Sequence, residues 1–160
     1  MTSLSLYRNP NVSDITEVSE LAQLTSLDLG WTSVAEIPGL QRLTELQTIY
    51  MTNTNQLISF HGLHDLPNLA TITIGPALSL DHFGIAAVSS LPSLTSLDLI
   101  GVNVHDLSYL VENDDFATGD VLNLYVGADT VASCEPALLN QLNELKDRGV
   151  DVTANCDGFE

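Results

Sequence analysis

Four histidines are the side chains in this sequence best suited to chemistry, and most of them stand beside acidic residues. His61 and His64 are three residues apart and precede Asp65, and adjacent Asp and His residues occur at 81–82 and 105–106. These groups could bind zinc, but a zinc site requires three or four converging ligands. The pairs belong to different parts of the chain, and no pattern brings them together. We therefore expect solvent-facing loop histidines, with no metal site and no cofactor.

Nucleophilic catalysis has no recognisable signature in the sequence either. A reactive serine or cysteine needs a base and an orienting acid within reach. No serine lies in a Gly-x-Ser-x-Gly sequence, and no glycine-rich phosphate-binding loop is present. We therefore expect that the chain is not an enzyme.

Calcium is the least implausible small ligand. Residues 112–120 concentrate side-chain oxygens in one segment, and Ca²⁺ prefers six to eight oxygen ligands. The spacing does not match an EF-hand loop, so we favour a solvated acidic turn over a calcium site.

The charge balance restricts the classes of partner. The chain has 21 acidic and four basic residues, with a net charge of −17. Nucleic acids and anionic membrane surfaces are themselves polyanions, so both are excluded as partners. No apolar run approaches the length of about 20 residues that inserts into a membrane. The charge favours a protein partner with a basic or mixed surface, or it serves only to keep the chain soluble.

A short apolar pattern repeats along the chain and predicts the elements that position these side chains. Each copy is apolar at every third position and then at every second, as in a turn or short helix that leads into a strand. Four copies superimpose without gaps, at 18–29, 40–51, 63–74 and 88–99, and weaker copies lie at 4–6 and 122–124. The first strand residues are 23, 22, 23, 25 and 25 residues apart, namely Leu4, Leu27, Ile49, Ile72, Leu97 and Leu122.

A unit of this length cannot bury its apolar face alone, so neighbouring units must stack. The repeats predict an α/β solenoid, a leucine-rich repeat stack with short parallel strands on the concave face. Irregular turns or short helices form its convex face, and a helix caps its C-terminal end. We expect a single domain over residues 1–160, with a truncated or uncapped first repeat at 1–18 and a C-terminal cap at 128–160.

Residues between the core positions of each strand point out of the concave face, because side chains alternate along a strand. The first outward column is Ser5, Asp28, Tyr50, Thr73, Asp98 and Asn123. The next column is Tyr7, Gly30, Thr52, Gly75, Ile100 and Tyr125.

These columns predict a protein–protein binding face, since exposed aromatic residues often anchor interfaces and the aspartates add negative charge. Trp31 follows a strand by two residues and fits either the rim of this face or packing over the convex loop. The predicted partner-binding residues are Tyr7, Asp28, Trp31, Tyr50, Asp98, Ile100, Asn123 and Tyr125.

The C-terminal segment has the features of a cap. Ser133 can cap a helix over residues 136–145, Gly149 is placed to end it, and a last strand at 150–152 can follow. The two cysteines, Cys134 and Cys156, bracket this helix. A disulfide between them would close a loop of about twenty residues and contribute roughly 3 kcal/mol. The alternative is two unrelated free thiols.

No helix or polar cap precedes the first strand. The first repeat would therefore expose Leu4, Leu6 and Ile15 on an uncovered end. Repeat stacks need capping units, so we expect further repeats, a cap or a signal peptide upstream. If Met1 is the true start, the apolar end would favour self-association.

The repeats resemble those of bacterial leucine-rich repeat proteins of the internalin-like class. Residues 4–15 fit best, because Asn9 lies where the ladder asparagine of that class belongs. Residues 119–152 look like the terminal unit of secreted members. Later repeats depart from the class at the ladder position, which is occupied by Thr32, Thr54, Ala77, Val102 and Gly127. We therefore expect little side-chain hydrogen bonding in those turns and irregular convex loops at 76–87 and 103–120.

The resemblance implies a non-enzymatic binding module at the cell surface or outside the cell. A disulfide would agree with this location, because disulfides persist mainly outside the cytosol. The opening residues lack the basic start and apolar stretch of a secretory signal, which favours the cytoplasmic alternative. The other functional reading is a structural spacer or C-terminal segment of a larger surface protein, without a ligand of its own.

Overall fold

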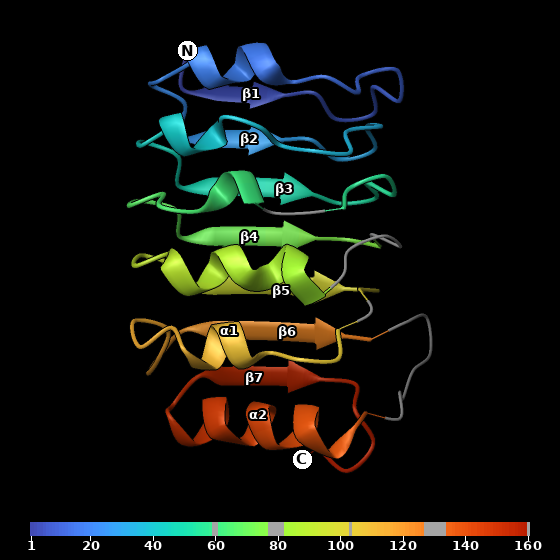
Figure 1. The fold of residues 1–160 in the computed structure, drawn as a ribbon, viewed down its shortest axis with the longest axis vertical. Coiled ribbons are helices and arrows are strands. Elements are labelled where there is room, and N and C mark those ends of the chain that lie inside the picture. The colour runs from blue at the N-terminus through green and yellow to red at the C-terminus, as the bar shows by residue number, and fades with distance from the viewer. Residues whose placement is uncertain (59–60, 77–81, 103, 127–133, 160) are drawn as a thin grey trace.

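Seven short strands form one parallel sheet in the computed structural model. The structure describes residues 1–58, 61–76, 82–102, 104–126 and 134–159, without the side chains of 82–85. Each strand pairs with the next one in the chain, so the sheet order equals the sequence order (Figure 1). The strands are β1 (Ser3–Ser5), β2 (Ser26–Asp28), β3 (Thr48–Met51), β4 (Thr71–Ile74), β5 (Ser96–Ile100), β6 (Val121–Tyr125) and β7 (Asp151–Ala154).

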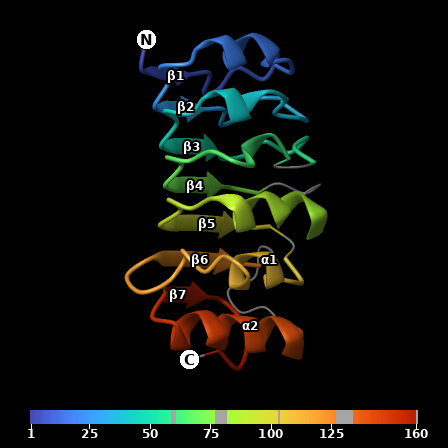
Figure 2. The same cartoon turned by 60° about the vertical axis from the view of Figure 1, so that its left-hand side comes forward.

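Short helices form the opposite side of the stack and return the chain to the next strand (Figure 2). Most are 3-10 helices, which have three residues per turn, so apolar residues at every third position all face the same way. Leu40, Leu43 and Leu46 follow this spacing, since the Leu43 amide bonds the Leu40 carbonyl and the Leu46 amide bonds the Leu43 carbonyl. All three leucines are fully buried. The helices are η1 (Thr16–Glu20), η2 (Leu40–Arg42), η3 (His61–Leu63), η4 (His82–Ser90), α1 (Ser108–Val111) and α2 (Pro136–Asp147).

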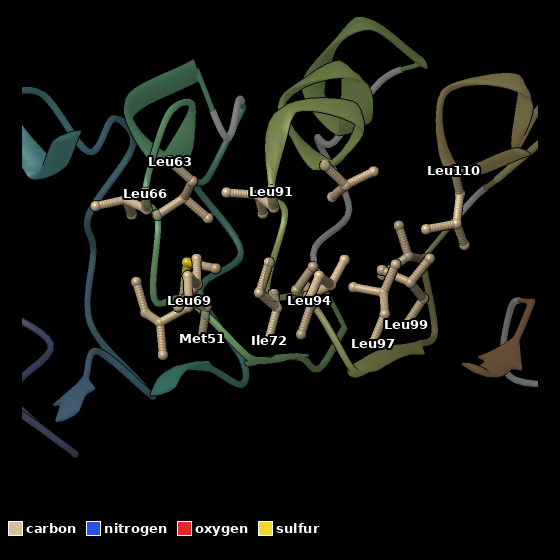
Figure 3. Close-up of a cluster of buried hydrophobic side chains, with 14 of the residues drawn as sticks. Met51, Leu63, Leu66, Leu69, Ile72, Leu91, Leu94, Leu97, Leu99 and Leu110 are labelled. Atoms are coloured by element: carbon tan, nitrogen blue, oxygen red, sulfur yellow. The ribbon is translucent and has the colours of Figure 1, made fainter. Parts of the chain in front are cut away.

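The core lies between the sheet and these helices. The first apolar residues of successive strands are paired in register, from Leu27 through Ile49, Ile72 and Leu97 to Leu122, and all five are fully buried. Figure 3 shows side chains from the strands and from the helical turns pointing toward one another in successive layers. Burial of one such side chain stabilises the fold by about 1.5–3 kcal/mol. The architecture confirms the leucine-rich repeat stack that the sequence predicts.

The turns after the strands contain more side-chain hydrogen bonds than the sequence suggests. Asn9 donates through Nδ2 to the carbonyls of Leu6 (3.0 Å) and Tyr7 (3.2 Å). In the next two repeats threonine takes over this role. The buried Thr32 hydroxyl donates to the Leu29 carbonyl (2.7 Å), and the buried Thr54 hydroxyl donates to the Met51 carbonyl (2.9 Å).

The prediction that side-chain hydrogen bonds would be missing from these turns was therefore wrong for Thr32 and Thr54. A threonine hydroxyl can still reach the carbonyl of the residue three positions earlier. Val102 makes no such bond and is fully buried instead. Ala77 and Gly127 lie outside the described residues, as do parts of the two loops expected to be irregular.

Helix α2 ends in a well-formed C-cap. Gly149 has a φ of +96°; its amide donates to the Lys146 carbonyl (2.9 Å), and the Val150 amide donates to the Leu145 carbonyl (3.1 Å). These two bonds form a Schellman motif, in which glycine is favoured because it tolerates positive φ. The predicted end of the helix is therefore confirmed. At the other end the N-cap residue is Glu135, and Ser133 lies outside the described residues.

Two polar side chains, Gln141 in α2 and Arg148 at its C-cap, form hydrogen bonds with the preceding repeat. Gln141 accepts a hydrogen bond from the Leu107 amide (2.7 Å) and donates to Asp106 (2.5 Å). The Arg148 guanidinium donates to the carbonyls of Val111 (2.6 Å) and Asn113 (3.1 Å). Three leucines of the helix, Leu138, Leu142 and Leu145, are buried on the core side, so the helix covers the last strands as the sequence predicts.

Strand β1 forms the other end of the sheet. Leu4 and Leu6 are partly buried, but Ile15 is only 3% exposed. The expectation that Ile15 would be exposed was wrong, because it belongs to the same buried cluster as Val18 and Leu24. None of the helices in the described part of the chain is long and apolar enough to cross a membrane.

Candidate binding face

The first outward column lies in perfect register across the sheet. Ser5 pairs with Asp28, Asp28 with Tyr50, and the pairing continues through Thr73 and Asp98 to Asn123. Neighbouring strands lie about 4.8 Å apart, so these side chains form a straight row. We call the outward surface of β1–β7 the sheet face.

Asp98 is held from both sides on this face. Its Oδ1 accepts a hydrogen bond from Asn123 Nδ2 (2.6 Å), and its Oδ2 accepts one from the Thr73 hydroxyl (3.2 Å). Both donors come from neighbouring strands, so the carboxylate orientation is fixed by the register itself. These donors are neutral and leave the negative charge of Asp98 uncompensated.

Asp28 is held in a related way. Its Oδ1 accepts a hydrogen bond from the Gly30 amide (2.9 Å), and its Oδ2 accepts one from the Ser5 hydroxyl (3.2 Å). Within the described residues, neither Asp28 nor Asp98 forms a salt bridge with a basic side chain. The sheet face therefore presents two oriented carboxylates that have no basic partner among the described residues.

Large apolar side chains stand beside these carboxylates. Tyr50 comes from the first column, and Tyr7, Ile100 and Tyr125 come from the second. All four side chains are 40–42% exposed. Each of them therefore leaves apolar surface in contact with water, and aromatic residues in this situation are common anchors of interfaces.

Gly30 fixes the position of the Tyr7 ring. A Cβ atom at Gly30 would lie 2.9 Å from Tyr7 Cδ2 and 2.8 Å from Thr52 Oγ1, closer than van der Waals contact. Only a residue without a side chain leaves this space free. Tyr7 therefore lies against the chain at Gly30, two residues after the end of β2, and the Arg8 guanidinium lies 5.3 Å from the centre of its ring.

Trp31 lies at the rim where the chain leaves β2. It has a φ of +59°, in the left-handed region, and its amide donates to the Thr52 carbonyl (2.8 Å). Arg8, Asn53 and Gly101 have positive φ at the same point of their repeats. The left-handed conformation costs a residue with a side chain about 1–2 kcal/mol. With 49% of its surface exposed, Trp31 gains little packing in return.

One further row on this face was not among the sequence predictions. A third column, at the start of the strands, carries hydroxyl side chains in five consecutive repeats, Ser3, Ser26, Thr48, Thr71 and Ser96, and their residues pair in register. A signal was available, because Ser or Thr precedes the first core residue of every one of these strands. The row gives the sheet face a polar margin.

His61 and His64 lie on the helical side of the stack, away from the sheet face. The rings of His61 and His64 are 5.3 Å apart, and His64 Nδ1 lies 2.8 Å from Asp65 Oδ2. With Ile58 they line a hollow of about 460 Å³ on the helical side. Across residues 1–58, 61–76, 82–102, 104–126 and 134–159, no three His, Cys, Asp or Glu side chains are arranged to hold a metal.

In the acidic segment at 112–120, the side chains of Asn113 and Asp120 form hydrogen bonds with the backbone. Buried Asn113 donates to the carbonyls of Val88 (2.9 Å) and Leu91 (3.1 Å), and its Oδ1 accepts from the Asp115 amide. Asp120 accepts from the Ala117 amide (2.8 Å). These contacts link the segment to the preceding repeat and fix the shape of the turn.

The two cysteines are joined in the structure. Cys134 and Cys156 form a disulfide with a Cα–Cα distance of 5.4 Å, and Cys156 is buried. The bond links the chain just before α2 to the chain just after β7. It belongs to the C-terminal cap rather than to the candidate binding residues.

Solved structures of Listeria monocytogenes internalins have a similar fold. Internalin InlF is 23% identical, and the match covers 98% of this chain and 48% of that structure with a TM-score of 0.68. Internalin C2 is 19% identical, and the match covers 96% of this chain and 71% of that structure with a TM-score of 0.53. The functional domain of InlJ, which includes a cysteine ladder, is 16% identical. The match covers 92% of this chain and 36% of that structure, with a TM-score of 0.54.

The likeness defines the fold as a leucine-rich repeat stack of the internalin-like class, and this confirms the resemblance drawn from the sequence. This chain spans about half the length of the InlF structure and about a third of the InlJ domain. No protein-family model and no curated protein matches the sequence.

Proposed function

We propose that the chain is a non-enzymatic protein-binding module whose sheet face engages the partner. The observation that carries the proposal is the alignment of Asp28, Tyr50 and Asp98 in one row, with both carboxylates oriented by neutral donors. Oriented charges beside exposed aromatic rings give a surface both specificity and binding energy. Tyr7, Trp31, Ile100, Asn123 and Tyr125 complete the proposed binding residues.

The charge of the whole chain supports a partner with a basic or mixed surface. All four basic residues already have partners: Arg8 lies over Tyr7, Lys146 lies over Phe159, Arg42 bonds Glu20 (3.0 Å) and Arg148 bonds backbone carbonyls. The net charge of −17 would raise the rate of association with a cationic surface. This enhancement would decrease at high salt, because salt screens the attraction.

An affinity capture from extracts of the source organism, or from surfaces that it encounters, tests this proposal. The unaltered chain is compared with a variant that carries Asp28→Ala, Tyr50→Ala and Asp98→Ala, and bound proteins are identified by mass spectrometry. We expect a partner that the unaltered chain retains and the variant loses. A partner that binds both equally would place the binding surface elsewhere.

A control variant separates loss of the face from loss of charge. Glu45 and Asp114 are exposed residues in turns outside the sheet face. The variant Glu45→Ala, Asp114→Ala removes the same number of carboxylates, and we expect it to retain the partner.

A second candidate function is a structural segment of a longer surface protein. The length of the InlF and InlJ structures, of which this chain matches 48% and 36%, favours it. If capture recovers no partner and the gene continues with further repeats, the segment becomes the preferred reading.

We also propose a location outside the cytosol. The support is the disulfide between Cys134 and Cys156, since disulfides persist mainly in oxidising compartments. Intact-mass measurement of protein purified from its native source, without reductant, tests this. A mass without the loss of two hydrogens would favour the cytoplasmic alternative.

A further inference from the structure

We infer that the sheet face binds an extended segment of its partner that crosses the strands and carries two basic side chains four residues apart. This inference rests on the proposed function and specifies the chemistry of the partner. The two basic groups would contact Asp28 and Asp98, and the residue midway between them would lie against Tyr50 and Thr73.

The spacing of the two carboxylates carries the argument. Asp28 lies on β2 and Asp98 on β5, and the paired residues between them are Tyr50 and Thr73. Three steps between neighbouring strands correspond to about 14 Å. An extended chain rises about 3.3 Å per residue, so four residues span about 13 Å.

The direction of the side chains agrees with the same conformation. In an extended chain, residues an even number of positions apart point to the same side, so residues i, i+2 and i+4 all face the sheet. A helix lying across the strands returns to the same face after seven or eleven residues, at about 10.5 or 16.5 Å. Neither distance matches the separation of the carboxylates as closely as the extended chain does.

The surface between the two carboxylates suits a flat segment. Gly30 and Gly75 precede and follow Thr52 in the second column, and a Cβ at either position would meet neighbouring atoms within 3.0 Å. The two glycines add no side chain of their own beside Tyr50, which is 41% exposed, and the Tyr7 ring and Thr52 fill the space at Gly30. The Tyr50 ring provides an apolar contact for the middle residue and a π face for a cation at Asp28.

The hydrogen bonds of both aspartates allow substitutions that remove charge and keep shape. In Asp98→Asn the remaining oxygen can accept from Asn123, and the new amide can donate to the Thr73 hydroxyl. In Asp28→Asn the oxygen can accept from the Gly30 amide, and the amide can donate to Ser5. Both variants are therefore expected to fold with the sheet face intact, which circular dichroism and thermal unfolding would verify.

The experiment measures the affinity of the full chain for three peptides of identical composition at low ionic strength. Each has nine residues, mostly Gly and Ser with one central Leu, and carries two arginines at positions i,i+2, i,i+4 or i,i+6. We expect the i,i+4 peptide to bind at least threefold more tightly than the others. Each Asn substitution should weaken its binding about two- to fivefold, because exposed ion pairs contribute modestly, and the double variant should abolish the preference for spacing.

The variant Glu45→Gln, Asp114→Asn serves as the matched control, since it removes two carboxylates away from the sheet face, and we expect it to keep the spacing preference. Equal affinity for all three peptides would overturn the inference, as would no binding of any peptide at about 1 mM. In those cases the capture experiment would still decide the proposed function, because a folded partner can use the same face without an extended segment.

Discussion

At the scale of the residue, the sheet face depends on side chains that are absent as much as on those that are present. Gly30 has no Cβ, and the space is occupied by Tyr7 and Thr52 instead. The sequence reveals a glycine in the outward column, but it does not reveal which neighbour fills the gap, since the contact joins residues of neighbouring repeats. This close approach leads to a first prediction.

We predict that Gly30→Ala destabilises the chain by about 1 kcal/mol, because the new methyl group overlaps Tyr7 and Thr52. In a background with Tyr7→Ala and Thr52→Ala the overlap disappears. There Gly30→Ala should instead stabilise the fold by about 0.5 kcal/mol, since alanine restricts the unfolded chain. Urea unfolding of the four variants measures both changes. The same destabilisation in both backgrounds would show that the close approach is not its cause.

Asp14 gives a second prediction at this scale. Thr16 donates to Asp14 Oδ1 from its hydroxyl (2.7 Å) and its amide (2.9 Å), and these bonds lower the pKa of the Asp14 carboxyl below its ordinary value of 3.8. A lowered pKa means that the ionised carboxylate stabilises the start of η1. This contribution is present above about pH 4 and is lost as the pH falls through the lower folded-state pKa.

An NMR titration of the Asp14 carboxyl carbon measures this pKa. In Thr16→Val the hydroxyl bond, which is the larger cause, is removed and the amide bond remains. We therefore expect the pKa to rise part of the way toward 3.8. An unchanged pKa in the variant would contradict the assigned cause.

At the scale of the element, the C-terminal cap is attached by partly buried polar groups as well as by apolar contact. Arg148 donates to two backbone carbonyls, and its side chain is only 24% exposed. We predict that Arg148→Ala destabilises the chain by about 1.5–3 kcal/mol, because hydrogen bonds from a charged donor are lost and two carbonyls lose their partner.

The matched control for this change is Arg42→Ala. Arg42 bonds Glu20 at 3.0 Å, but both side chains are about two thirds exposed or more. A surface ion pair of this kind contributes about 0.5 kcal/mol. Thermal or urea unfolding compares the two variants. Equal effects would show that the contacts of Arg148 do not secure the cap.

The elements that the sequence predicts well are those that the repeat itself determines. Strand positions, the outward columns and the helix from Pro136 follow from a period that fixes which side chains are buried. Contacts without a period escaped prediction. Gln141 and Asp106 are 35 residues apart and Arg148 and Val111 are 37 apart, and no pattern in the sequence connects them. The hydroxyls of Thr32 and Thr54 were also misjudged, since their type differs from the asparagine of the first repeat.

At the scale of the whole molecule, the excess of negative charge acts against the compact state. A net charge of −17 is spread over a stack whose few basic residues are already engaged. Salt shortens the range of this repulsion, from about 30 Å at 0.01 M to about 3 Å at 1 M. We predict that the free energy of unfolding rises with NaCl concentration over this range, measured as the midpoint of urea unfolding.

A charge-reduced variant provides the control for the salt effect. Glu17, Glu45, Asp114 and Asp157 are exposed, and none of them forms a salt bridge with a basic side chain in the described part of the chain. Their replacement by Gln or Asn should raise stability at low salt and flatten its salt dependence. A fall in stability with added NaCl would show that repulsion between acidic groups does not limit the fold.

The consecutive order of the strands also determines how the molecule responds to mechanical force. The two termini lie at opposite ends of the long axis (Figure 1), and the hydrogen bonds between strands run along that axis. A pull on both ends therefore loads these bonds one row at a time, as in opening a zipper, rather than shearing many rows together. An optical trap should record a series of small steps at low force. Each step would release one repeat of 22–25 residues, or about 80 Å of extended chain, and reduction of the disulfide would lengthen the step that includes the cap.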